Sequence, residues 1–73
     1  MATQIVMDHT GDSRHEFNTA DARAVAEAEE RFKMLAGAGF TAAKRLAEGK
    51  SEVLKSFDPR AEETLFIPRL KGG

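Results

Sequence analysis

Hydrophobic and polar positions alternate with a period of two near the start of the chain. Residues 3–8, TQIVMD, place Ile5 and Met7 on the same side, which is typical of a strand with one better-buried face. Residues 13–18, SRHEFN, alternate again, and the HTGD segment before them supplies Gly11 for a tight turn. We therefore predict an N-terminal β-hairpin.

The period then changes to that of a helix. An alanine-rich, proline-free run predicts a helix from about residue 20 to about residue 36, and Gly37 and Gly39 are expected to end it. Its apolar side chains recur at helical spacing and form one stripe, which consists of Val25, Ala28, Phe32 and Leu35. Its start offers polar side chains for the first turn: Asn18 or Thr19 as the cap, then Asp21 near the positive end of the helix dipole. Glu29 and Lys33 are placed to pair at i, i+4.

Three further segments are expected to be extended. They are FTAAKRL from Phe40 to Leu46, VLKSFD at 53–58 and TLFIPRL from Thr64 to Leu70. Asp58-Pro59 should stop the second of them, because proline cannot continue a ladder. Pro68 indicates that the last strand is leaving the sheet at that point, or lies at an edge.

The order strand, strand, helix, strand, strand, strand defines the fold class. It predicts an α+β domain in which one helix packs across one face of a mixed sheet, and residues 1–73 are expected to form a single domain. The expected core consists of the five phenylalanines with Val25, Leu35, Leu65 and Ile67. The pattern leaves open the order in which the later strands pair.

Composition narrows the class of protein. The 73 residues are 41% hydrophobic and 32% charged, with a net charge of −1, which predicts a folded globular chain that binds neither nucleic acid nor a membrane surface. There is no cysteine, so a disulfide framework, a thiolate metal site and a cysteine nucleophile are excluded. No apolar run suggests a membrane span or a signal peptide, so a cytoplasmic monomer is the expectation.

The two ends of the chain carry a resemblance. The opening QIVMDHTGD, with Thr-Gly in its turn, and the ending RLKGG are similar to the two ends of the ubiquitin-like β-grasp family, and the element order agrees over nearly the whole chain. Bacterial sulfur-carrier proteins share that fold and the diglycine end. The resemblance implies a β-grasp-like sheet and a bacterial protein modifier or sulfur carrier.

The resemblance also implies roles for the tail, residues 69–73, which is expected to be flexible. Gly73 would supply a carboxylate that an ATP-dependent adenylating enzyme activates, and Gly72 would give it clearance in a narrow channel. Residues Arg69, Leu70 and Lys71 would help that enzyme to recognise the tail. An acceptor protein's lysine would then form an isopeptide bond, or a sulfur donor would leave a thiocarboxylate. The chain would be the passenger, with no catalytic residue or cofactor of its own.

Other interpretations remain beside this one. The first is an inert tail on a non-covalent interaction module, or small structural subunit, that binds through its sheet face or an edge strand. His9 and His15, with Asp8 and Asp12, flank the hairpin turn, but their spacing matches no zinc signature and we expect a solvated turn without metal. Ser13 and His15 lack an orienting third group, so we expect no catalytic pair.

Overall fold

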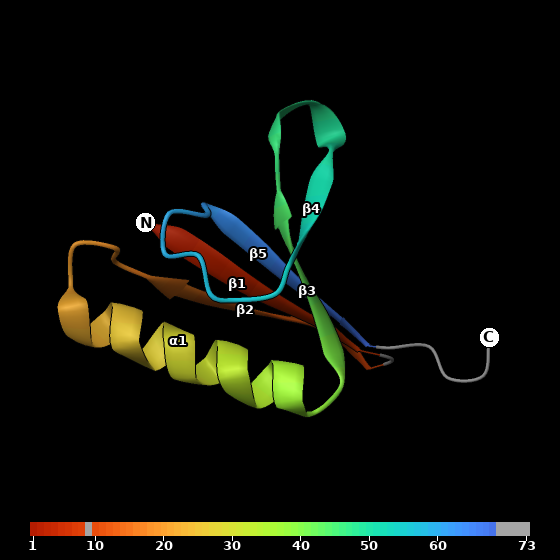
Figure 1. Cartoon of the computed structure of the whole chain (residues 1–73), viewed down its shortest axis with the longest axis horizontal. Helices are drawn as coiled ribbons and strands as arrows, with labels where there is room; N and C mark the ends of the chain where they lie inside the picture. The colour runs from red at the N-terminus through yellow and green to blue at the C-terminus, as the bar shows by residue number, and fades with distance from the viewer. Residues whose placement is uncertain (9, 69–73) are drawn as a thin grey trace.

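The computed structural model describes residues 1–8 and 10–68. The predicted order of elements is confirmed, with one helix after two strands and three strands following it (Figure 1). The elements are β1 (Ala2–Asp8), β2 (Gly11–Phe17), α1 (Ala22–Gly37), β3 (Phe40–Arg45), a 3₁₀ turn (Ala47–Gly49), β4 (Ser51–Leu54) and β5 (Glu63–Pro68).

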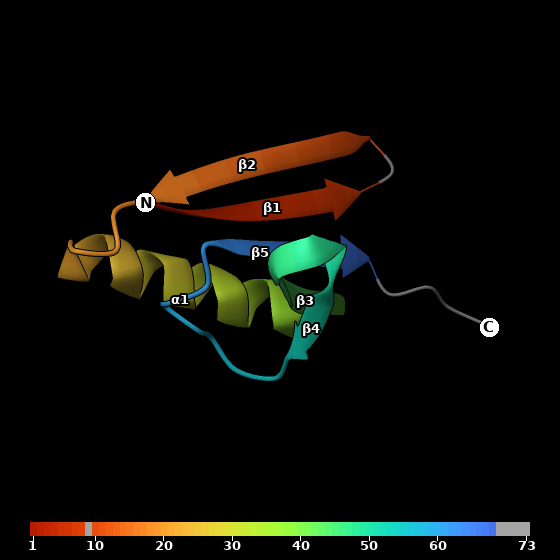
Figure 2. The ribbon, with the colours of Figure 1, turned by 90° about the horizontal axis from the view of Figure 1, so that it is seen from above.

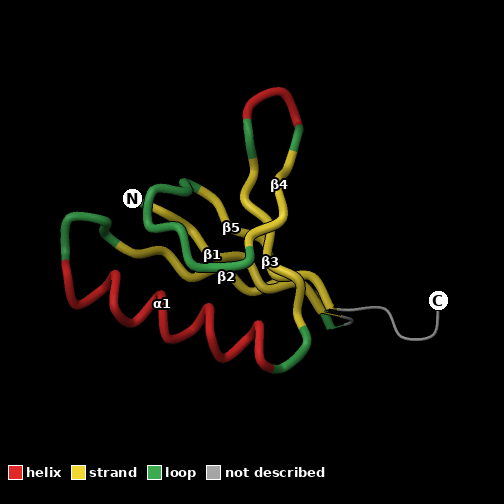
Figure 3. Tube along the Cα trace, in the orientation of Figure 1, coloured by secondary structure: helices red, strands yellow, loops and turns green. Residues whose placement is uncertain are grey.

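The five strands form one mixed sheet in the order β2-β1-β5-β3-β4. Strands β1 and β5 pair in parallel, whereas the pairs β1–β2, β3–β5 and β3–β4 are antiparallel. Helix α1 lies along one side of the sheet, and the β3–β4 hairpin rises on the opposite side (Figures 1 and 3). Seen from above, β2, β1 and β5 run side by side (Figure 2). The fold is therefore α+β with a β-grasp-like arrangement, and the strand order that the sequence left open is now defined.

The N-cap of helix α1 is a later residue than the sequence suggested. Asp21 is the N-cap, because its side chain accepts hydrogen bonds from the backbone N–H groups of Arg23 and Ala24. Asn18 instead accepts from the N–H of Ala20 in the preceding turn, so the prediction of a cap at Asn18 or Thr19 is wrong. Aspartate at the cap satisfies two of the free donors of the first turn.

The predicted ion pair is present, and the predicted helix end is confirmed at Gly39 but not at Gly37, which is the last residue of α1 and has no positive φ. At the C-terminus of α1 the chain turns through Gly39, whose φ of +100° is a conformation that favours glycine. On the surface of α1, Lys33 Nζ lies 3.9 Å from Glu29 Oε2.

The core lies between α1 and the sheet. Phe32 of α1 packs edge-to-face on Phe66 of β5, with ring centroids 5.7 Å apart. Phe57, from the loop after β4, contacts the rings of both Phe32 and Phe17. All five phenylalanines are buried or partly buried, as predicted, but Ile67 is 43% exposed because it lies on the face of β5 turned away from α1. Its assignment to the core was wrong.

Strand β1 turns an unexpected side towards the helix. Gln4, on the helix side, is 1% exposed; its Nε2 donates to the carbonyl oxygen of Ala28 at 3.0 Å, and its Oε1 accepts from Arg31 at 2.8 Å. Ile5 is equally well buried on the other face. The expectation of a single better-buried face holding Ile5 and Met7 is therefore wrong, since β1 is an interior strand whose Gln4 has buried partners.

Strand β4 lies earlier in the sequence and is shorter than predicted: it runs over Ser51–Leu54 instead of 53–58, so the predicted stop at Asp58-Pro59 is wrong. It ends at Leu54, and residues 55–62 form a loop that returns past α1 to the start of β5 (Figure 2). Two interactions take this segment out of the ladder. Phe57 turns into the core, and Asp58 closes a turn by accepting a hydrogen bond from the N–H of Arg60.

Candidate functional site

The strand that leads to the predicted site lies in the middle of the sheet. Strand β5 pairs with β1 on one side and with β3 on the other, and its last residue, Pro68, lies opposite Phe40. Pro68 is also the last residue that the structure describes. The predicted site residues, namely Arg69, Leu70, Lys71, Gly72 and Gly73, lie outside the described residues.

The position of Pro68 is fixed by the core. Thr64, Leu65 and Phe66 are all buried, and Phe66 is 0% exposed between α1 and the sheet. Full burial of a phenylalanine side chain contributes about 1.5–3 kcal/mol to folding. Proline has no N–H to donate, so Pro68 suits the end of a strand. It is the last residue of β5 that the structure describes, and the expected extension to Leu70 lies outside the described residues.

The end of the sheet at Pro68 also carries the β1–β2 turn. Because β1 and β5 are parallel, the C-terminal ends of both strands lie at the same end of the sheet. Asp8 ends β1 there, and its Oδ1 accepts a hydrogen bond from the N–H of Thr10 at 2.8 Å. Gly39, before β3, lies at this end as well. The chain therefore leaves the described fold beside two tight turns.

The face of the sheet turned away from α1 carries an apolar row. Ile5 lies beside Leu65, Leu65 beside Ala43, and Ala43 beside Val53, so the row crosses four strands. Met7 and Ile67 lie two residues along from Ile5 and Leu65 on the same face. We call this set the open-face cluster; its members are Ile5, Met7, Ala43, Val53, Leu65 and Ile67. Ile67 and Val53 are the exposed members, the latter at 64%.

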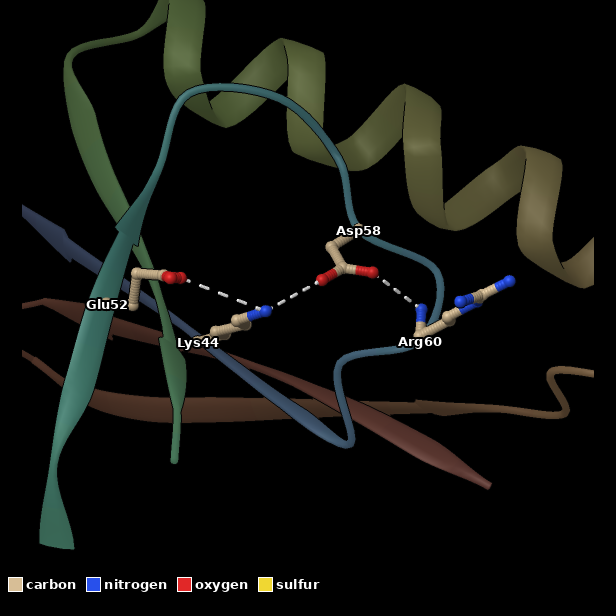
Figure 4. A network of polar contacts seen from close by, with 4 residues as sticks. All are labelled: Lys44, Glu52, Asp58 and Arg60. Atoms are coloured by element: carbon tan, nitrogen blue, oxygen red, sulfur yellow. Dashed lines mark hydrogen bonds and ion pairs between the residues drawn. The ribbon is translucent and has the colours of Figure 1, made fainter. Parts of the chain in front are cut away.

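A polar network ties the β3–β4 hairpin to the loop before β5 (Figure 4). Lys44 Nζ donates to Asp58 Oδ2 at 3.1 Å and lies 3.9 Å from Glu52 Oε2. The N–H of Arg60 donates to Asp58 Oδ1 at 2.9 Å. This backbone hydrogen bond, followed by the one from Lys44, holds the pKa of Asp58 below its ordinary value of 3.8. The network borders an open hollow of about 680 Å³, which is lined by residues 44–47 of the hairpin and by residues 58 and 60–62 of the loop before β5.

A second ion pair crosses from β3 to β5 on the open face. Arg45 Nε lies 3.2 Å from Glu63 Oε1, which is buried but does not meet hydrogen-bond geometry. The attraction is therefore coulombic, and with Arg45 55% exposed it contributes little to stability. Both networks join β3 to β5 or to the loop before it.

The histidine candidates do not gather into a site. Among the described residues, no three side chains of histidine, aspartate or glutamate are placed to hold a metal ion. His9 lies outside the described residues. Ser13 and His15 are both exposed on β2, and neither side chain forms a hydrogen bond with another described residue.

Sequence reasoning missed two of these features. The open-face cluster depends on the register between strands that are distant in sequence. The usable signal in the sequence was an apolar residue at a strand position that faces away from the helix, as at Val53 and Ile67. The Lys44–Asp58 contact spans 14 residues and has no local signature.

Comparisons of the chain with protein-family models, with curated proteins and with solved structures each found no match. Architecture alone therefore defines the class, a small α+β domain with a β-grasp-like sheet. Within the residues that the structure describes, α1 lacks the length and apolar character needed to cross a membrane.

Proposed function

We propose that this protein is a ubiquitin-like modifier or sulfur carrier that is activated at the carboxylate of Gly73. The observation that carries the proposal is the β-grasp-like fold with a central last strand leading directly into the RLKGG sequence. The buried residues of β5 precede the tail directly in the sequence, and Pro68 has no N–H with which to continue the ladder. Both features favour a tail that is presented to another protein.

The proposed chemistry starts from a carboxylate, which is a poor electrophile. The carboxylate of Gly73 attacks the α-phosphate of ATP, pyrophosphate leaves, and an acyl-adenylate forms. A lysine amine of an acceptor protein then displaces AMP to give an isopeptide bond, or a sulfide-level sulfur donor displaces AMP to give a thiocarboxylate. Gly72 and Gly73 have no side chains to obstruct this transfer, and residues 69–71 serve in recognition. With no cysteine in the chain, the adenylating enzyme supplies any thiol.

Reconstitution tests the proposal. The purified protein is mixed with ATP and the adenylating enzyme of its own organism, and its intact mass is followed. We expect an adenylate or a downstream adduct that maps to Gly73, and none from a chain that lacks Gly72 and Gly73. Replacing Gly72 with valine should slow activation at least about tenfold, since a β-branched residue restricts the backbone and blocks a narrow channel. Formation of the adduct by the shortened chain would overturn the proposal.

The second candidate function is a non-covalent interaction module. The two exposed members of the open-face cluster, Val53 and Ile67, favour it, because solvent-facing positions of a sheet are ordinarily polar. Val53→Lys and Ile67→Lys test this candidate, since both side chains are exposed and the fold should tolerate the change. If the protein works through this face, both variants lose its partner while the chain without Gly72 and Gly73 retains it.

A further inference from the structure

A hollow lies at the seam between α1 and the loop after β4. Its volume is about 310 Å³, and it is lined by Glu29, Phe32, Lys33 and Ala36 of α1 and by Lys55, Ser56 and Phe57 of the loop. The floor is apolar, since the rings of Phe32 and Phe57 meet edge-to-face at 6.0 Å with Ala36 beside them. Only the rim is charged. We call this feature the seam hollow.

The rim carries more positive than negative charge. Lys33 is 66% exposed, and its only carboxylate among the described residues is that of Glu29, at 3.9 Å. Lys55 forms no hydrogen bond or ion pair with any described residue. Two lysines and one glutamate thus line the apolar floor, and the carboxylate of Glu29 holds Lys33 weakly.

We propose that the seam hollow binds a segment of a partner protein that presents one large apolar side chain next to an aspartate or glutamate. The apolar side chain covers the rings of Phe32 and Phe57, and the carboxylate pairs with Lys55 and Lys33. Burial of the apolar group supplies affinity, whereas the two cations select acidic over basic neighbours.

The size and openness of the seam hollow favour a peptide side chain over a small-molecule ligand. Its volume falls at the lower end of the range of about 300–1,000 Å³ that small-molecule sites occupy. It is also a surface seam between a helix and a loop, so a bound group would keep one side in contact with the rest of a partner. A single aromatic or leucine side chain is the natural occupant.

This site is independent of the proposed function. None of the residues that line the seam hollow belongs to the open-face cluster or to residues 69–73. A chain without Gly72 and Gly73 should therefore bind the same segment with unchanged affinity, so failure of one proposal is distinguishable from failure of the other.

A titration monitored by NMR tests the inference on the isotope-labelled full chain. The probe is a capped five-residue peptide with one phenylalanine followed by two glutamates between glycines. Two matched peptides replace both glutamates with lysine, or the phenylalanine with alanine. We expect saturable shifts centred on Phe32, Ala36, Ser56 and Phe57 with the first peptide only. Shifts centred elsewhere, equal shifts with the lysine peptide, or no saturable shift at millimolar peptide would each overturn the proposal.

Charge reversal gives the second arm of the test. Lys33→Glu combined with Lys55→Glu should weaken binding of the acidic peptide about tenfold or more, because two favourable pairs become repulsions. The control is Lys50→Glu, at an exposed lysine next to the 3₁₀ turn and outside the seam hollow, which should leave the affinity unchanged. Ala36→Phe should fill the hollow and abolish binding of the peptide while the spectrum stays that of a folded protein. Equal affinities in the double variant and the Lys50 control would contradict the inference.

Discussion

Single polar side chains hold together parts of this protein that apolar packing alone would leave loose. Helix α1 crosses the sheet on a narrow stripe, and buried Gln4 adds hydrogen bonds to Ala28 and Arg31 at the middle of that stripe. Asp58 does the same for the loop before β5, through Lys44 and Arg60. Each case joins elements that are far apart in the sequence, so neither could be predicted from local pattern.

Replacement of Gln4 should lower the stability of the protein considerably for a single side chain. Gln4→Ala removes both hydrogen bonds and leaves unfilled volume under α1, so we expect the free energy of unfolding to fall by about 1–3 kcal/mol. Urea denaturation measures the change. Glu16→Ala, at an exposed position on β2, is the control and should stay within about 0.5 kcal/mol of the parent. A Gln4 variant as stable as the control would show that the buried amide does not hold the helix.

Asp58 should make stability depend on pH. Its folded-state pKa lies below the ordinary value, so its contribution is present above the unfolded pKa and is lost as pH falls through the folded pKa. Asp58→Asn should therefore lower the free energy of unfolding at pH 7 by about 0.5–1.5 kcal/mol, and the difference from the parent should shrink below about pH 4. Urea denaturation across this range checks it, with Asp12→Asn as the matched loss of a carboxylate that accepts no hydrogen bond among the described residues. A difference that is constant with pH would contradict the assignment.

At the scale of elements, periodicity identified each strand and the helix but not how they face one another. The stripe from Val25 to Leu35 predicted the packed side of α1, and alternation located the strands other than β4, which lies at Ser51–Leu54 instead of 53–58. Alternation cannot say which side of an interior strand meets the helix, because both sides of such a strand can be buried. Ile67 was therefore placed in the core although it lies on the open face, and Gln4 was not expected to be buried.

Two neighbouring residues of β5 test directly which face of this strand packs against α1. Phe66 points to α1 and Ile67 to the open face. Phe66→Ala should therefore lower the free energy of unfolding by about 3–5 kcal/mol, and Ile67→Ala should lower it by less than about 1 kcal/mol. For a domain of this size, the first loss is enough to leave much of the protein unfolded. Circular dichroism during thermal unfolding measures the stability of both variants. Similar losses for the two variants would show that β5 is not oriented as described.

At the scale of the whole molecule, Pro68 is the last residue of the fold that the structure describes. The five strands, the helix and both core clusters lie within residues 2–68. A chain truncated after Pro68 should therefore keep its thermal midpoint within about 4 °C of the parent, which corresponds to less than about 1 kcal/mol. A fall well beyond that would show that residues 69–73 belong to the packed fold and would weaken their proposed role as a presented tail.

The fate of Gly73 in the cells that make the protein tests the central claim most directly. Trypsin cuts after Lys71, so a conjugate would leave Gly72-Gly73 on the acceptor's lysine, and peptide mass spectrometry would identify both that lysine and its protein. A sulfur carrier would instead show an intact mass in which one sulfur atom replaces one oxygen atom. We predict one of these two products. Recovery of only the free, unmodified acid, together with no adenylate in the reconstituted reaction, would contradict the account.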